Sequence, residues 1–353
     1  MKRLLAILPL LGIVVLVQFV TSWTGTQFYL TQMTMAAYYS LLIIGLCVLM
    51  GYAGQISLGH AGFFAIGGYL SAALTTQNLM AHQEDGVVRL LEAAGLLLAG
   101  HDLYGADFLV VSPWPAAIIA VLVAAMIAVL IGIPVLKLKG HYLAMATLGF
   151  GIIIYRLVLA SPWFGEADGI SGVPPFVLLP GLVVSGESAG RVQNYYIAWG
   201  VLLLGLFLLL NLIHSRVGRA LRAIHGSEEA ADAMGVNVSR FKLHTFVLSA
   251  IFAAIAGVLL THFNGGIGPS EAGVMKSVRY VAIVAVGGMA HLWGALIMGV
   301  LLNFLSLRGV FGSYDDAVFG LILILIMLFA PNGILSLLAR KKSQGALPDS
   351  AEG

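Results

Sequence analysis

Long apolar runs separated by short polar segments make up most of this chain. A helix needs about 20 mainly apolar residues to cross a bilayer, and several runs reach or approach that length. We expect crossing helices at 4–20, 36–50, 116–136, 140–159, 195–212, 243–263 and 317–335. The pattern predicts an all-α polytopic membrane protein.

Two further apolar stretches are interrupted by glycines. The first contains GYAGQISLGHAGFFAIGG, from Gly51 to Gly68, and the second is divided at 287–294 into halves that are each too short to cross alone. Glycine inside a helix costs about 1 kcal/mol relative to alanine, so we expect interrupted helices, with the first interruption including Gly67 and Gly68. Counting these segments gives about ten spans, some discontinuous. Their matching positions in the two halves suggest an internal two-fold repeat.

The interruptions hold the residues that we expect to line a translocation path. Backbone that is not helical at membrane depth is tolerated only where it lines a cavity or is buried in protein. A tightly packed helix crossing explains the same glycines equally well. The candidate path residues are Gly51, Gly54, Gln55, Ser57, Gly59, His60, Gly287 and Gly288.

No residue is predicted to be catalytic, and no metal site is expected. Ser57 and His60 stand close together, but a nucleophile elbow needs glycine two residues before the serine, where Gln55 stands. The chain has no G-x-x-x-x-G-K-[ST] phosphate loop, no H-E-x-x-H and no C-x-x-C. We therefore expect neither an enzyme nor a cofactor bound by this chain. If ATP drives transport, other subunits bind it.

A polar segment at 215–242, SRVGRALRAIHGSEEAADAMGVNVSRFK, separates two spans in the second half. Ser227 is a suitable N-cap for a helix that begins with Glu228 and Glu229, and Gly235 can take the left-handed conformation that ends a helix. We expect a short helix at about 228–234. Because so short a helix is marginal alone in water, its alanine and methionine face needs a partner surface. The alternative is a solvated loop with the arginines typical of the cytoplasmic side.

Two polar segments are expected on the opposite side of the membrane. The insertion at 76–113 has apolar residues at helical spacing over 87–99, which predicts an interfacial helix. The loop at 161–194 is rich in glycine and proline and includes DGISGVP, from Asp168 to Pro174. Its position suggests contact with an external protein, but an ordinary connecting loop has the same composition.

Composition and charge agree with a membrane protein and predict its orientation. Hydrophobic residues make up 60% and charged residues 10%, with a mean hydropathy of +0.99, whereas soluble domains have roughly 25% charged residues. The net charge of +2 gives no reason to expect nucleic acid. Cations gather on one side of the predicted spans, which is then the cytoplasmic side and holds both termini. They are Lys137, Lys139, Arg216, Arg219, Arg222, Arg340, Lys341 and Lys342.

Two classes of transporter remain, besides a wholly structural membrane protein. One is the membrane subunit of a binding-protein-dependent ABC importer, and the other is a stand-alone carrier driven by a proton or sodium gradient. Such a carrier usually keeps acidic residues within its spans for the coupling ion. The acidic residues of this chain lie in loops or at predicted span ends, which favours the importer.

Three separated motifs resemble the ABC importer permeases of the LivM type, over about residues 36–335. They are the G-x-x-G-x-x-S-L-G-H-A segment from Gly51 to Ala61, the YLA and TLGFG elements between Tyr142 and Gly151, and the loop from Gly218 to Val236. In that family the loop carries a short coupling helix that enters a cleft of the ATPase subunit. The resemblance assigns this role to Gly218, Arg219, Ala220, Arg222, Glu228, Glu229, Ala230, Ala231 and Gly235. His225, Gly226 and Ser227 replace residues that are commonly charged in the family.

The resemblance also implies a substrate, partners and a location. The expected function is import of branched-chain amino acids across the bacterial inner membrane, while related permeases take urea, short amides or other amino acids. The implied partners are the lipid bilayer, a LivH-like permease subunit, two cytoplasmic ABC ATPase subunits that bind the ATP, and a periplasmic substrate-binding protein. The expected organisation is an N-terminal span and outside loop at 1–35, a permease domain at 36–335 and a cytoplasmic basic tail at 336–353.

Overall fold

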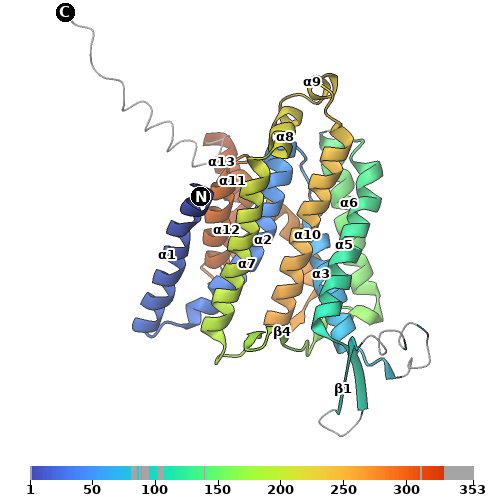
Figure 1. The fold of residues 1–353 in the computed structure, drawn as a ribbon, viewed down its shortest axis with the longest axis vertical. Coiled ribbons are helices and arrows are strands. Elements are labelled where there is room, and N and C mark those ends of the chain that lie inside the picture. The colour runs from blue at the N-terminus through green and yellow to red at the C-terminus, as the bar shows by residue number, and fades with distance from the viewer. Residues whose placement is uncertain are drawn as a thin grey trace, which may run out of the picture.

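The structure, a computed structural model, describes residues 2–80, 86, 89, 95–101, 107–138, 140–310 and 312–329. Its longer helices run roughly along one direction and form a bundle (Figure 1). The helices are α1 Lys2–Trp23, α2 Phe28–Ala53, α3 His60–Thr76, α5 Pro113–Val135, α6 His141–Ala160, α7 Arg191–Ile213, α8 Arg216–Gly226, α9 Glu228–Ala233, α10 Val238–Asn264, α11 Val274–Gly287, α12 Leu292–Leu307 and α13 Asp315–Phe329. Lys139 and the predicted basic tail at 336–353 lie outside the described residues.

Five helices of the described residues, α2, α5, α6, α7 and α10, are long and apolar enough to cross a membrane. The apolar part of α1, Ile7–Trp23, and α12 are shorter. The chain is therefore a polytopic membrane protein, as the apolar runs predict. A count of about ten crossings also requires α1, α3, α11, α12 and α13, and that count stays a prediction.

Helix α2 begins at Phe28, well before the predicted start at Ala36. Polar residues lower the hydropathy of this first part, but two of their side chains form hydrogen bonds inside the bundle. The Thr34 hydroxyl donates to the Leu30 carbonyl oxygen at 2.8 Å, and the Gln32 amide donates to the carbonyl oxygen of Leu307 at 3.4 Å. A domain boundary at residue 35 would therefore divide a helix.

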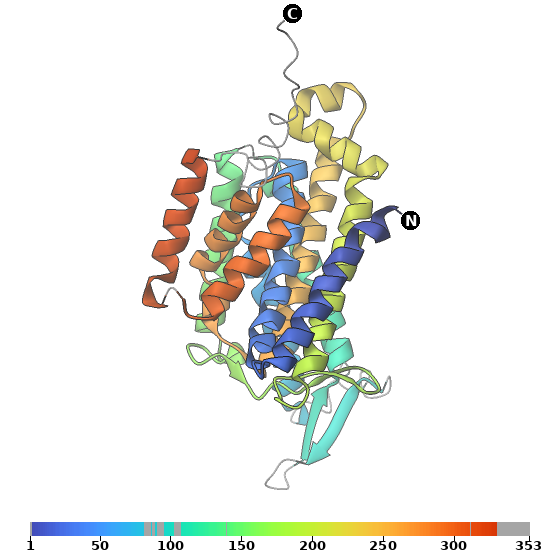
Figure 2. The ribbon, with the colours of Figure 1, turned by 90° about the vertical axis from the view of Figure 1, so that its left-hand side faces the viewer.

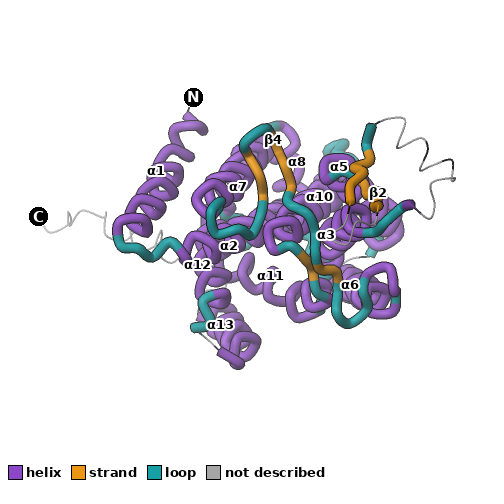
Figure 3. Tube along the Cα trace, turned by 90° about the horizontal axis from the view of Figure 1, so that it is seen from below, coloured by secondary structure: helices purple, strands orange, loops and turns teal. Residues whose placement is uncertain are grey.

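Helix α2 lies at the centre of the bundle and packs against α7, α10 and α12 (Figure 3). Helix α3 crosses α10 so closely that side chains are excluded at the crossing. A Cβ at Gly67 would lie 2.3 Å from the Ala254 carbonyl oxygen, and a Cβ at Gly257 would lie 2.0 Å from the Phe64 oxygen. The predicted interruption at Gly67 and Gly68 is wrong, because α3 is continuous and its glycines allow this close approach.

Within the described ranges, three two-stranded antiparallel sheets lie in the connections, and the all-α expectation left them out. Strand β1, Leu97–His101, pairs with β2, Asp107–Val111; β3, Ile170–Ser171, pairs with β6, Gly266–Ile267; and β4, Phe176–Leu179, pairs with β5, Leu182–Val184. The helix predicted at 87–99 is wrong for its last three residues, which belong to β1. A short apolar run does not distinguish strand from helix by spacing alone.

The two ends of the bundle differ in structure. Helices α8 and α9 extend beyond one end, and the β-hairpins project from the other (Figures 1 and 2). Lys137 directly follows α5, and α8 carries Arg216, Arg219 and Arg222. The orientation of the chain in the membrane stays a prediction.

Candidate functional site

The two glycine-rich interruptions meet at the end of the bundle that carries α9. One is the connection between α2 and α3, and the other is the turn between α11 and α12. A Cβ at Gly51 would lie only 1.4 Å from the Met289 carbonyl oxygen. The hydroxyl of Tyr52 donates to the carbonyl oxygen of Ala290 at 2.8 Å. The two predicted parts of the path therefore form one packed unit.

Gly287 and Gly288 form the tight turn by which the chain passes from α11 to α12. A Cβ at Gly287 would lie 2.5 Å from the carbonyl carbon of Gly294, so the two helices touch backbone to backbone here. Gly288 has a φ of 98°, which favours glycine. These two residues shape the turn that holds Met289 against α2.

His60 is the centre of a buried polar network at the start of α3. Its Nδ1 lies 3.0 Å from the Ser57 hydroxyl, and its Nε2 lies 2.7 Å from the hydroxyl of Ser249 in α10. The backbone N–H of Ala61 donates to the Ser277 hydroxyl of α11 at 3.1 Å. Both ring nitrogens of His60 have serine partners, so the imidazole connects α3 to α10.

The segment between α2 and α3 also lies directly beneath α8. Gly54 has a φ of 67°, and a Cβ there would be 3.0 Å from Nδ1 of His225 in α8. A Cβ at Gly59 would lie 2.6 Å from the Thr147 carbonyl oxygen of α6. Gln55 is 1% exposed, and neither polar atom of its side-chain amide has a hydrogen-bond partner in the part of the chain that the structure describes. A buried amide of this kind is suited to a polar solute, because buried polar groups are normally partnered.

Helix α8 presents its arginines to solvent while its apolar residues hold it to the bundle. The Ser215 hydroxyl caps the helix by accepting from the backbone N–H groups of Val217 at 3.1 Å and Gly218 at 3.4 Å. A Cβ at Gly218 would lie 2.2 Å from the Ile213 carbonyl oxygen, which places α8 tightly against the end of α7. Leu221 and Ile224 are buried, whereas the predicted coupling residues Arg219 and Arg222 are exposed and Ala220 is half-buried.

Helix α9 has the caps that the sequence predicts. The Ser227 hydroxyl accepts from the Ala230 N–H at 3.2 Å, and Gly235 ends the segment with a φ of 81°. Met234 is 84% exposed. Ala231 is 3% exposed, so it supports the helix from inside. The outward surface, named here the α9 surface, consists of Glu229, Ala230, Asp232, Ala233, Met234 and Gly235.

An ion pair that sequence reasoning missed holds α9 to α10. The ammonium group of Lys242 donates to a carboxylate oxygen of Glu228, and the Lys242 side chain is only 6% exposed. Lys242, Thr245, Phe246 and Ser249 are all buried on one face of α10. The sequence did contain a signal for this ion pair, because Lys242 falls on the core face of a predicted helix and a buried lysine needs a partner.

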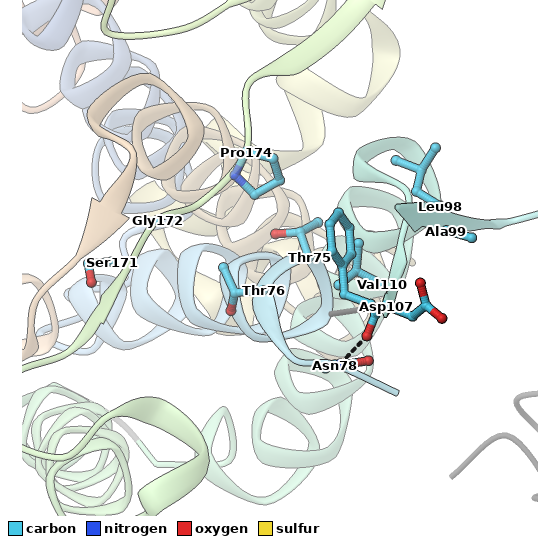
Figure 4. Close-up of a pocket in the computed structure, with 11 residues that line it drawn as sticks. Thr75, Thr76, Asn78, Leu98, Ala99, Asp107, Val110, Ser171, Gly172 and Pro174 are labelled. Atoms are coloured by element: carbon cyan, nitrogen blue, oxygen red, sulfur yellow. Dashed lines mark hydrogen bonds between the residues drawn. The ribbon is translucent and has the colours of Figure 1, made fainter. Parts of the chain in front are cut away.

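A cavity of about 590 Å³ opens at the hairpin end, far from α9 (Figure 4). Its lining comes from the end of α3, the β1–β2 hairpin, and Ser171, Gly172 and Pro174 of the loop predicted to lie outside. The Asn78 amide group donates to the carbonyl oxygen of Asp107 at 3.1 Å, and its oxygen accepts from the Leu109 N–H at 3.0 Å. These bonds attach the hairpin to α3 and hold one wall of the cavity.

Comparison with known proteins gives a family match over most of the chain. The family described as branched-chain amino acid transport system / permease component matches residues 28–327. The chain is 31% identical to the high-affinity branched-chain amino acid transport system permease protein LivM of Salmonella typhimurium, over 86% of this chain and 68% of that protein. It is 29% identical to the LivH permease protein of the same transport system in Escherichia coli K12, over 87% of this chain and 96% of that protein.

A shorter match extends to a sugar permease. The ribose import permease protein RbsC of Haemophilus influenzae is 33% identical over 126 residues, which cover 33% of this chain and 38% of that protein. The comparison with solved structures finds no match. The LivM and LivH proteins, which match most of this chain, have names that specify branched-chain amino acids.

Proposed function

This chain belongs to the branched-chain amino acid permease family, and from that premise we propose that it is the membrane-spanning subunit of a binding-protein-dependent ABC importer. It translocates leucine, isoleucine and valine across the bacterial inner membrane. Separate cytoplasmic subunits bind and hydrolyse the ATP. The partial match to a ribose permease leaves family membership unchanged, but it means that the solute has to be tested directly.

The continuous contact between α9 and the glycine-rich interruptions carries this proposal. Lys242 ties α9 to α10, and Ser249 of α10 holds His60 at the start of α3. Gly54 lies against His225 of α8. A force applied to α9 by an ATPase therefore reaches the segment that contains Gln55. This is the link that a permease without its own ATPase needs.

The partners follow from the family and from the two ends of the bundle. Similarity to both LivM and LivH supports a second, LivH-like permease beside this chain. Two ATPases dock at the α9 end, and a periplasmic binding protein meets the hairpin end near the cavity of Figure 4. The exposed arginines of α8 support a cytoplasmic location for that end and for both termini.

Ten crossings and a two-fold repeat belong to the same proposal. Helices α3, α11, α12 and α13 are short for a crossing, but each continues a bundle in which neighbouring helices are long enough. The interruptions after α2 and after α11 lie at the same end and touch. Their contact supports a path between the two halves.

A cysteine at position 234 tests the docking of an ATPase. Cys47, the one cysteine of the chain, is buried, so Met234→Cys introduces an accessible thiol at an 84% exposed position. We expect a thiol-directed photo-cross-linker to join this variant to a nucleotide-hydrolysing subunit in native membranes. The matched control is Met126→Cys, a 60% exposed methionine on α5, which should capture no such subunit.

Failure of Met234→Cys to capture an ATPase contradicts the proposed docking. Labelling of that thiol from the periplasmic side contradicts the proposed orientation. Uptake of leucine by vesicles that lack any ATPase would instead identify a stand-alone carrier. Uptake of urea in place of leucine by the complete complex would contradict the proposed solute and would leave the proposed coupling to the ATPase unaffected.

A further inference from the structure

A polar cluster that the coupling mechanism does not use lies between α2 and α11. Oε1 of Glu271, in the short helix Pro269–Ala272, accepts from the Tyr39 hydroxyl at 3.0 Å and from the Lys276 ammonium at 3.0 Å. The Lys276 nitrogen is also 4.9 Å from the centre of the Tyr39 ring. Nothing in the hydropathy pattern indicated this cluster, because Tyr39 and Glu271 are 232 residues apart.

The cluster lies deep in the bundle. Tyr39 is 11 residues from the start of α2 and 14 from its end, which are about 16 Å and 21 Å along a helix. Glu271 is at the same depth because it bonds to Tyr39. The side chains of Glu271 and Lys276 are only 19% and 25% exposed. Ionised groups at such depth are rare and mark pathways for solutes or ions.

Three buried polar atoms in this region have no hydrogen-bond partner among the described residues. They are Oε2 of Glu271 and the hydroxyls of Tyr69 and Tyr280. Both tyrosines are 1% exposed. The Tyr280 ring centre lies 6.2 Å from that of Tyr39, which bonds to Glu271, and Tyr69 packs in one buried cluster with Ala272, the neighbour of Glu271. Buried polar atoms are normally paired. Three of them around one acid form an unused set of donors and acceptors at mid-depth.

We infer that Glu271, Tyr69 and Tyr280 bind the ammonium group of an α-amino acid in transit, while Lys276 binds its carboxylate. This inference rests on the proposed transport function and adds a binding site to it. Lys276 already places a primary ammonium against Glu271 and over the Tyr39 ring, so this site accommodates such a group. A zwitterion matches both members of the ion pair without adding net charge, whereas urea carries no charge to match.

Removing the free hydroxyls tests the site without disturbing existing bonds. We expect Tyr280→Phe and Tyr69→Phe each to lower ATP-dependent leucine uptake by roughly tenfold in proteoliposomes that contain the whole importer, the loss typical of one charge-assisted hydrogen bond. Thermal stability should not fall, because neither hydroxyl has a hydrogen-bond partner among the residues that the structure describes. The matched control is Tyr38→Phe, whose hydroxyl is equally unpartnered but whose ring packs against Phe263. It should keep parental uptake.

Glu271→Gln provides the second test, with Glu187→Gln in an exposed loop as its control. We expect Glu271→Gln to lower leucine uptake at least tenfold while binding-protein-stimulated ATP hydrolysis stays within about twofold of the parent. Parental uptake by Glu271→Gln, or by both tyrosine variants, overturns the assigned site. Absence of uptake by the unmodified complex overturns the proposed function itself, so the two failures are distinguishable.

Discussion

Alanine at position 51 is expected to abolish uptake and to destabilise the protein by about 3 kcal/mol or more, the upper range for overpacked sites. The added Cβ would lie 1.4 Å from the Met289 carbonyl oxygen. Ordinary contact begins near 3.4 Å, so α2 and the α11–α12 turn would have to separate by about 2 Å. That movement also breaks the bond from Tyr52 to Ala290.

Gly149→Ala is the matched control for this substitution. Gly149 lies inside α6, and a Cβ there meets nothing within 4 Å. Alanine is favoured over glycine in a helix by about 1 kcal/mol, so this variant should be at least as stable as the parent. Thermal unfolding of both purified variants in detergent, together with uptake in proteoliposomes, makes the comparison. Equal stability of Gly51→Ala and Gly149→Ala would contradict the close approach at Met289.

Removing the two members of the α9–α10 ion pair is expected to have unequal effects. Glu228→Ala leaves the Lys242 ammonium unpaired at 6% exposure, and we expect a loss of about 3 kcal/mol in the free energy of unfolding. Lys242→Met removes that buried charge and leaves the Glu228 side chain, which is 36% exposed, to interact with water. Its cost should be about 1 kcal/mol or less.

Both variants should reduce ATP-coupled uptake, because each releases α9 from α10. The control is Arg240→Ala, an exposed position in the first turn of α10, which should change neither stability nor uptake. Chemical unfolding gives the order of stabilities, and uptake divided by ATP hydrolysis gives the coupling. A larger loss of stability in Lys242→Met than in Glu228→Ala would contradict the burial of this lysine.

Local patterns were enough to predict the features that depend on neighbouring residues. The α9 helix was found because Ser227 and Gly235 act within one or two turns of the residues they cap. The break at 287–294 was found because each apolar half is short. The family resemblance was also confirmed, since the matching motifs are contiguous in the chain.

Features that depend on distant contacts were not predicted. Gly67 has the low helix propensity of any glycine, yet α3 continues through it because packing against Ala254 outweighs local preference. The partners Lys242 and Glu228, like Glu271 and Tyr39, lie on separate elements whose proximity only the fold determines. The candidate path and coupling residues were placed near one another by structure, while their roles in transport stay predictions.

The pairing of β3 with β6 makes α10 a lever with a fixed end. Ile170 and Ile267 are register partners, so the chain leaving α10 is clamped to the loop that follows α6. Helix α10 has 27 residues, about 40 Å at 1.5 Å each. Ser249 lies 15 residues from the clamped end, so a tilt that starts at α9 moves this serine roughly three fifths as far as the tip. A displacement of α9 therefore reaches Ser249, the hydrogen-bond partner of His60, diminished by less than half.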